Sequence, residues 1–181
     1  MRTLLAYRDD GLLAQLLGRA NPVAPSLLTL LAIAPLGAAI ALGEDSTAAV
    51  GAVFAWMILF GALSRGGPLE RDRFNWAVPP LLRIGEYAAL VWLHPAAALA
   101  VLIPLAYRHY DLVYRLRYQR RTPPEWGGGW DGRLLVGWAL LALDALPEGF
   151  YVLGGILGAL FVAESVASWL SNDDPEGDST A

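Results

Sequence analysis

The chain has 181 residues, of which 56% are hydrophobic and 17% charged, and its formal net charge is −4 at pH 7. Soluble globular domains carry charge on about a quarter of their residues, so this composition excludes an ordinary soluble domain and indicates a membrane protein. The chain contains no cysteine and only two histidines, which excludes disulfides, thiolate catalysis and Cys- or His-rich metal sites. We expect no metal, no cofactor and no nucleic-acid partner.

The first element, residues 1–20, has leucines at helical spacing: Leu4, Leu5, Leu12, Leu13, Leu16 and Leu17. Arg8, Asp9 and Asp10 interrupt the apolar pattern, so this segment is not a cleavable signal peptide. The spacing predicts an amphipathic helix lying on the membrane surface, and a helix packed against a soluble partner is the alternative.

Six apolar segments follow within residues 21–171. A transmembrane helix needs about 20 mostly apolar residues to cross a hydrocarbon core of about 30 Å. Residues 24–43 and 46–64 meet this rule without a charge, and the short turn between them predicts an antiparallel hairpin. The other four spans carry ionisable residues; they are residues 74–92, 95–107 with a helical continuation through Leu116, 134–146 and 150–170. Residues 172–181 are expected to form a disordered acidic tail. The predicted fold is an all-α integral membrane protein, a six-transmembrane-helix bundle with an N-terminal amphipathic interfacial helix.

The arginines predict the orientation, because short cytoplasmic loops hold an excess of positive charge. With the N-terminus inside, 12 of the 13 basic residues, all of them arginine, lie on the cytoplasmic side. The three outer turns, around Glu44, His94 and Pro147, contain none. We therefore expect a multi-pass protein of the cell (inner) membrane with both termini in the cytoplasm.

Small residues on the last span predict how it packs. Gly154, Gly158 and Ala159 give one flank small side chains at about four-residue spacing. Such residues let two helix backbones approach closely in a membrane. We expect another span to lie against this flank.

Arg83 and Glu86 form the first group of ionisable residues inside a span. Each such residue costs about 2.5–3.5 kcal/mol on insertion scales, so it needs a partner or a task. The two residues are three positions apart on one helix, and we expect them to form an intramembrane pair. A ligand-facing role is the alternative.

Glu164 forms the second group, about two turns from the cytoplasmic end of the last span. It is too deep for easy solvation and must find a counter-charge. Arg108, Asp111 and Arg115 occur at i, i+3 and i+7 on the fourth span. They share one helical face, and we expect this face to supply the partner.

A glycine-rich loop lies at the same cytoplasmic rim, where Gly127 to Gly129 are followed by Trp130, Asp131 and Arg133. Backbone N–H groups and arginine side chains together can bind a phosphate. The candidates for binding phosphate or a lipid headgroup are Arg65, Arg108, Arg115 and Arg133. The alternative is that the arginines serve only topology or attract anionic lipids. Neither common nucleotide-binding fingerprint is present.

The first span opens with N-P-V-A-P-S-L-L at residues 21–28, and with six spans and a leading amphipathic helix the chain resembles the CDP-alcohol phosphatidyltransferases. That family carries D-x-x-D-G-x-x-A-R-x8-G-x3-D-x3-D, whose four aspartates hold two divalent metals. The same spacing puts Gly61 and Arg65 on the first glycine and the arginine. The four aspartate positions fall on apolar residues: Met57, Phe60, Val78 and Leu82. The resemblance therefore implies the architecture without the metal site.

Three segments carry a second resemblance: DRFNWAVPPLLRIGEY at residues 72–87, YRHYDLVYR at 107–115 and GWDGR at 129–133. They are similar to an uncharacterised membrane domain of actinobacteria. That domain occurs attached to nucleotidyltransferase and CDP-alcohol phosphatidyltransferase domains. This resemblance implies a context in lipid synthesis rather than an activity.

Two functional hypotheses follow. In the first, the chain is a non-catalytic partner in phospholipid or polar-lipid headgroup synthesis, in contact with membrane lipids and their anionic headgroups. It would form a homodimer or pair with a CDP-alcohol phosphatidyltransferase. In the second, it is a membrane phosphotransferase acting on a lipid or CDP-alcohol, with a site on the cytoplasmic face. Its candidate residues are Arg108, His109, Asp111, Asp131, Arg133 and Glu164, with His109 or Asp111 as the base. A small transporter is disfavoured, because no inverted repeat is visible.

Overall fold

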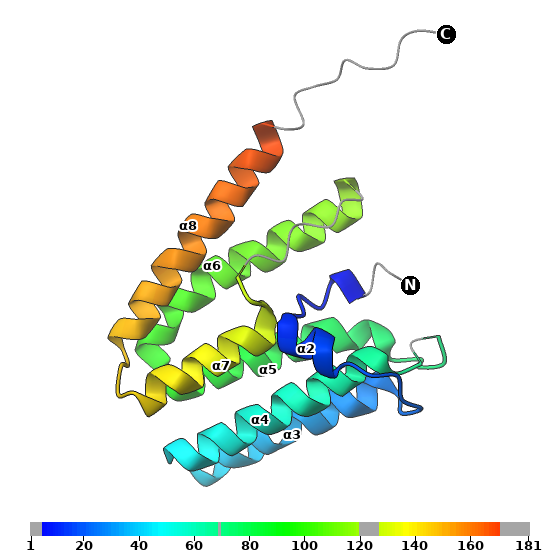
Figure 1. Ribbon diagram of the computed structural model, residues 1–181, viewed down its shortest axis with the longest axis horizontal. Coiled ribbons are helices and arrows are strands. Elements are labelled where there is room, and N and C mark those ends of the chain that lie inside the picture. Colours follow the sequence, from blue (N-terminus) through cyan, green and yellow to red (C-terminus); the bar gives the residue numbers. More distant parts are fainter. Residues whose placement is uncertain (1–4, 69, 120–126, 171–181) are drawn as a thin grey trace, which may run out of the picture.

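The computed structural model describes residues 5–68, 70–119 and 127–170, and these residues form helices and turns with no strand (Figure 1). The helices are α2 (Leu12–Leu17), α3 (Pro25–Leu42), α4 (Thr47–Leu63), α5 (Val78–Leu93), α6 (Pro95–Tyr114), α7 (Gly129–Ala142) and α8 (Glu148–Leu170). Short 3-10 turns lie at Ser64–Gly66 and Asn75–Ala77, and a π-helical turn at Arg115–Gln119 continues α6. The all-helical prediction is confirmed for this part of the chain.

Four helical segments are long and apolar enough to cross a membrane: Pro25–Leu42, Thr47–Gly66, Pro95–Tyr118 and Glu148–Leu170. Their outer faces expose large apolar side chains such as Leu30, Ile103 and Val152, as expected of a surface in contact with lipid. Helices α5 and α7 have 16 and 14 residues. They measure about 24 and 21 Å, shorter than a hydrocarbon core of about 30 Å. The six expected spans thus divide into four of spanning length and two shorter helices.

Local signals explain where these helices begin and end. Helix α3 has Pro25 in its first turn and ends at Gly43, whose φ of 69° is the left-handed conformation that glycine adopts at helix ends. Ser46 caps α4, because its hydroxyl accepts a hydrogen bond from the Ala49 N–H. Helices α3 and α4 lie side by side across this turn (Figure 1), which confirms the predicted antiparallel hairpin. Similarly, His94 ends α5 and caps α6, accepting a hydrogen bond from Ala97 N–H at 3.1 Å.

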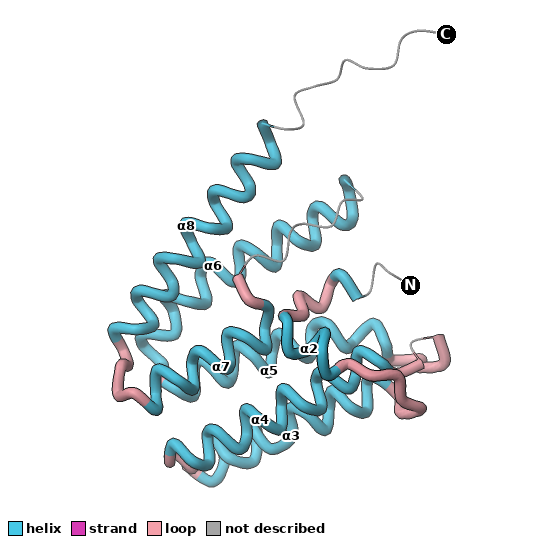
Figure 2. The backbone as a smooth tube through the Cα atoms, in the orientation of Figure 1, coloured by secondary structure: helices cyan, strands magenta, loops and turns pink. Residues whose placement is uncertain are grey.

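The long helices alternate in direction and form two groups. Figures 1 and 2 show the α3–α4 hairpin beside α5 and α7, and the pair α6–α8 diverging from them toward the C-terminus. One hydrophobic cluster joins the first group and includes Leu36, Phe54, Met57, Leu82 and Leu134. A second cluster joins α5, α6 and α8 and includes Leu90, Val101, Leu105, Phe150 and Phe161.

The close approach predicted for the last span occurs between α8 and α6. A Cβ added at Gly154 would lie 2.2 Å from the Ala100 carbonyl oxygen, so a larger residue would push the helices apart. Gly158 also faces α6, where an added Cβ would lie 3.9 Å from Pro104 Cβ. Ala159, by contrast, is exposed.

The N-terminal segment differs from the expected helix over residues 1–20. Its described part contains two helical residues, Leu5 and Ala6, then a turn around Arg8 to Gly11, and then α2, which is six residues long. Asp9 adopts a φ of 54°, which ends any helix at that point. Helix α2 is amphipathic, because Leu12 is 69% exposed whereas Ala14 is fully buried against the bundle. The turn that interrupts the expected helix carries the buried charges of Arg8 and Asp10.

Candidate functional site

Glu164 of α8 lies between two arginines of α6: Arg108 within the helix and Arg115 at the C-terminal end of that helix. Arg108 Nη1 donates to Glu164 Oε2 at 2.5 Å, and Arg115 Nη1 donates to Oε1 at 2.7 Å. All three side chains are buried, and the Arg108 guanidinium lies 5.4 Å from the centre of the Phe161 ring. A buried carboxylate is stable only when such charge-assisted bonds replace water. The prediction that this face of α6 supplies the partner of Glu164 is confirmed.

Asp111 and Ser165 complete this end of the network. Arg115 Nε lies 2.8 Å from Asp111 Oδ2, an i,i+4 pair on the helix. The Ser165 hydroxyl oxygen accepts from the Tyr107 hydroxyl at 2.8 Å and from Arg115 Nη2 at 3.3 Å. Arg115 therefore uses all three guanidinium nitrogens within the protein.

Arg133 of α7 binds carboxylates from two other parts of the chain. Its Nε donates to Glu86 Oε1 at 2.5 Å, and its Nη2 donates to Asp9 Oδ2 at 2.9 Å and Glu86 Oε2 at 3.3 Å. Its Nη1 donates to the Gly127 carbonyl at 3.3 Å. Arg133 thus ties α5, α7 and the N-terminal turn together at a buried position.

Arg83 and Glu86 do not form the expected pair. Glu86 is fully buried and points to Arg133, whereas Arg83 Nη2 donates to the Tyr7 carbonyl at 2.8 Å. The spacing of Arg83 and Glu86 on one helix allows them to pair. Arg133 of the neighbouring helix α7, however, donates to both carboxylate oxygens of Glu86 inside the bundle.

His109 connects α5 to the N-terminal turn. Its Nδ1 lies 2.6 Å from the Tyr87 hydroxyl, and its Nε2 lies 3.6 Å from Asp9 Oδ2. Arg108 Nε is 4.0 Å from Asp9 Oδ1. Asp9 therefore faces three nitrogen-bearing side chains, those of Arg133, His109 and Arg108.

The ionisation of Asp9 follows from these neighbours. Burial by itself raises the pKa of Asp9, but the Arg133 guanidinium, His109 and Arg108 outweigh burial and hold that pKa well below its usual range. Asp9 is consequently a carboxylate at neutral pH. It acts as the internal anion of this cationic cluster.

A second buried cluster surrounds Asp10. Its carboxylate accepts from Arg8 Nε at 2.9 Å, Arg65 Nη1 at 2.6 Å and Trp130 Nε1 at 2.9 Å. Arg8 also donates to the Ser64 hydroxyl and the Gly61 carbonyl at the end of α4. Arg65, a candidate for binding phosphate, is thus paired inside the protein and remains 29% exposed.

Asp131 and the glycine-rich loop hold the N-terminal turn. Asp131 is fully buried, and its two oxygens accept from the N–H groups of Gly11 and Ala14, which caps α2. The Trp130 N–H donates to the Asp9 carbonyl at 3.1 Å. A Cβ at Gly129 would lie 2.0 Å from Gly11 N, and Gly129 has a φ of 68°, so the two backbones touch at a position that requires glycine. The glycine-rich loop, one of the candidates for phosphate binding, thus packs against the turn through Gly129.

The structure brings most candidate residues into one network and separates the rest. Arg108, His109, Asp111, Arg115, Arg133 and Glu164 belong to this buried network, which also contains Glu86 and Asp9. Asp131 and Arg65 belong to the Asp10 side of the turn. Sequence reasoning missed Arg8, Asp9 and Asp10 as site residues. Their signal was three consecutive charges within an apolar segment, which burial makes costly unless each has a partner.

The positions that align with the metal-binding aspartates do not fit a metal. Met57, Val78 and Leu82 pack in the same hydrophobic cluster, and Phe60 stacks on Trp56 with ring centres 4.3 Å apart. Divalent metals of this kind need oxygen ligands, which these side chains lack. Across residues 5–68, 70–119 and 127–170, no group of three His, Asp or Glu side chains has the arrangement to hold a metal ion.

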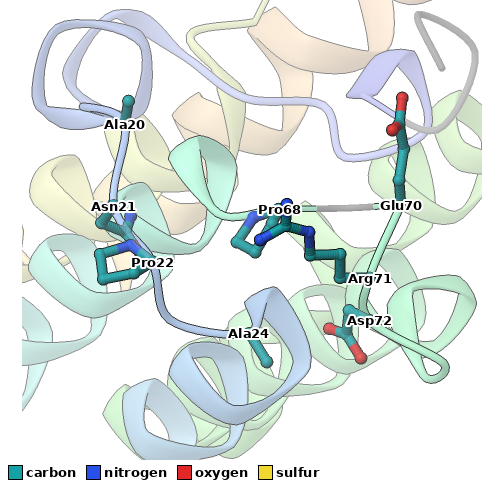
Figure 3. A pocket seen from close by; sticks show the side chains of 8 residues that line it. All are labelled: Ala20, Asn21, Pro22, Ala24, Pro68, Glu70, Arg71 and Asp72. Atoms are coloured by element: carbon teal, nitrogen blue, oxygen red, sulfur yellow. The ribbon is translucent and has the colours of Figure 1, made fainter.

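A cavity of about 760 Å³ lies outside both clusters, where the segment before α3 meets the one before α5 (Figure 3). Asn21, Glu70, Arg71 and Asp72 line it together with four small or cyclic residues, Ala20, Pro22, Ala24 and Pro68. Asp72 accepts from the Ser26 N–H at 2.7 Å and hydroxyl at 2.9 Å, and from the Phe74 N–H at 2.9 Å. Burial raises the pKa of Asp72, but these hydrogen bonds outweigh it and the pKa lies below its usual value. Asp72 therefore caps α3.

Comparison with curated proteins and comparison with solved structures each give no match. A family model, described as a family of unknown function, matches residues 1–181. The match includes the N-terminal turn, the buried charge network and all the helices. The chain belongs, over its whole length, to this family, DUF5941.

Proposed function

We propose that this chain is a non-catalytic membrane domain that acts as a partner in the synthesis of phospholipid or polar-lipid headgroups. The observation that carries the proposal is the pairing of the candidate catalytic side chains with one another. A general base has to reach its substrate. Glu164 and Asp111 are instead bound in ion pairs with arginines, and Asp131 is bound to two backbone amides.

The apolar metal positions are a second support. Where the phosphatidyltransferases carry carboxylates, this chain has the packed side chains Met57, Val78 and Leu82. A bundle of that architecture with apolar side chains at the metal-binding positions can bind a partner protein, but it cannot hold the metals that metal-assisted transfer needs. Its partner would be a second copy of the chain or an active CDP-alcohol phosphatidyltransferase.

The alternative, a phosphotransferase using the cytoplasmic-face residues, has less support. His109 and Asp111 would have to act as bases from positions occupied by Tyr87, Asp9 and Arg115. Releasing Asp111 would also break its ion pair with the buried Arg115 side chain, which is unfavourable.

We further infer that all six long helices cross the inner membrane, with both termini in the cytoplasm. The alternating directions of α3 to α8 support six crossings (Figure 1). The excess of arginine at one set of helix ends supports the orientation. Helices α5 and α7 are shorter than the bilayer, but a short helix is accommodated by local thinning at a small cost. Reporter fusions after Leu170 should read cytoplasmic and one at Glu44 external; an external reading after Leu170 would exclude this topology.

The partner role is tested by reconstitution in liposomes. The chain alone should convert no radiolabelled CDP-alcohol in the presence of Mg²⁺ or Mn²⁺, and these ions should not raise its melting temperature. Added to a reconstituted CDP-alcohol phosphatidyltransferase from the same organism, it should form a complex and change the turnover. Headgroup transfer by the chain alone would overturn the proposal in favour of the alternative.

A further inference from the structure

The cationic cluster around Asp9 has the geometry of an anion site filled from within the chain. Arg108, His109 and Arg133 approach the Asp9 carboxylate from α6 and α7, and all are at least nine-tenths buried. Asp9 itself comes from the N-terminal turn, which is separated from these helices by about a hundred residues of sequence. The carboxylate therefore belongs to the N-terminal turn, whereas the three nitrogen-bearing side chains belong to the helical framework.

Asp9 fits the cluster incompletely. Among the described residues, only Arg133 Nη2, at 2.9 Å, lies within hydrogen-bond distance of its side-chain oxygens; His109 Nε2 is 3.6 Å and Arg108 Nε 4.0 Å away. His109 Nε2 is buried and has no hydrogen-bond partner in this part of the chain. A group with more oxygens and a wider reach than a carboxylate would contact all three side chains.

His109 is held with a donor toward this position. The Tyr87 hydroxyl lies 2.6 Å from Nδ1. When that hydroxyl donates to Nδ1, the neutral ring carries its hydrogen on Nε2, which then faces the anion. The contact that fixes the ring therefore also prepares it to bind an oxyanion.

Charge balance also favours an anion at this point. The network contains Arg108, Arg115 and Arg133, and against them the carboxylates of Glu86, Asp111 and Glu164. These six charges cancel without Asp9. Arg83, which donates to the Tyr7 carbonyl beside the turn, adds a fourth cation. Among the described residues of this network, removal of Asp9 would leave four arginines against three carboxylates.

We propose that Arg108, His109 and Arg133 form a binding site for a phosphate group, and that Asp9 occupies this site until a phosphate displaces it. The ligand chemistry is that of a phosphomonoester, carried by a lipid headgroup or by free phosphate. The N-terminal turn would then leave the cluster when phosphate binds. This inference does not rest on the partner role, because it concerns binding alone and needs neither an enzyme nor a transfer step.

The test uses the full chain in an uncharged detergent and measures thermal melting. Asp9→Asn removes the charge but keeps a residue that tolerates the left-handed backbone. We expect this variant to melt lower than the wild-type chain and to be restored by inorganic phosphate, saturably, against chloride at equal ionic strength. Its phosphate affinity should exceed that of the wild-type chain about tenfold or more, since the latter must first displace Asp9.

Asp10→Asn is the matched control. Asp10 is adjacent and its side chain is also buried, but its partners are Arg8, Arg65 and Trp130. This variant should also melt lower, and phosphate should not restore it. Adding His109→Gln to Asp9→Asn should weaken the phosphate effect. If phosphate has no saturable effect on Asp9→Asn, or restores Asp10→Asn equally, the proposal is overturned.

Two further measurements complete the test. Dihexanoyl phosphatidate replaces inorganic phosphate in a second arm: an effect of the lipid alone assigns the site to a lipid phosphomonoester, an effect of both assigns it to phosphate itself, and an effect of neither overturns the site. If Asp9→Asn does not fold, hydrogen exchange on the wild-type chain decides. Phosphate or the short-chain lipid should then accelerate exchange at the Trp130 amide, which donates to the Asp9 carbonyl; unchanged exchange overturns the proposal.

Discussion

The α3–α4 hairpin and the charged network around Arg133 and Glu164 are stabilised in different ways. The two hairpin helices contain no titratable residue and pack through apolar side chains such as Leu36 and Phe54. The network joins the N-terminal turn, α5, α6, α7 and α8 through buried ion pairs. An apolar side chain is satisfied by lipid or by protein, whereas a buried charge is satisfied only by a specific partner. The network therefore depends on the exact placement of its partners, whereas the hairpin tolerates change.

The largest effect should come from Glu164. Glu164→Ala leaves Arg108 and Arg115 without their shared carboxylate and should destabilise the protein by about 3–5 kcal/mol. Arg108→Ala should cost a similar amount. The double variant should lose clearly less than the sum, as measured by a double-mutant cycle on detergent-solubilised protein. Additive losses, or a neutral Glu164→Ala, would show that these residues do not form one unit.

Asp131 should come next. Asp131→Ala removes the acceptor of the Gly11 and Ala14 N–H groups, and leaving buried donors unsatisfied should cost about 1–3 kcal/mol. Asp131→Asn keeps one acceptor oxygen and should lose less. Denaturant melts of both variants provide the measurement. Equal losses would contradict the capping role.

The effect of pH through Asp9 should be smaller. Because the folded-state pKa of Asp9 lies below its usual value, its ion pairs stabilise the protein above the usual aspartate pKa of about 4. This stability is lost as pH falls further, toward the folded-state pKa. Melting temperatures of the wild-type chain should therefore fall more steeply below about pH 4 than those of Asp9→Asn. Parallel curves would contradict this assignment.

The smallest effect should come from the hairpin. Ile58→Val removes one methylene from a buried position in α4 and should cost about 0.5–1.5 kcal/mol. The loss should be the same at acidic and neutral pH, because no charge lies among the packed residues. A pH-dependent loss would show that the hairpin and the network are coupled.

Sequence patterns predicted the hairpin and the last span closely. Residues 24–43, 46–64 and 150–170 were expected to span, and the helices are Pro25–Leu42, Thr47–Leu63 and Glu148–Leu170. Long uncharged runs, a terminal glycine and a capping serine are local signals, so one sequence suffices to read them. The counter-charge of Glu164 was also predictable, because burial demanded a partner and a single helical face offered arginines.

The tertiary structure decided the partners of Glu86, Asp9 and Asp10. Their arginines lie far away in the sequence, and helical spacing favoured the wrong neighbour, Arg83, for Glu86. The path of the N-terminal turn could not be predicted from the sequence either, because it depends on contacts with Gly129 and Asp131, which are far away in the sequence. The sequence by itself determined which segments are helical and apolar, since those properties are local. Which charges meet was decided only by packing, because a buried ion pair forms wherever the fold brings two opposite charges within reach.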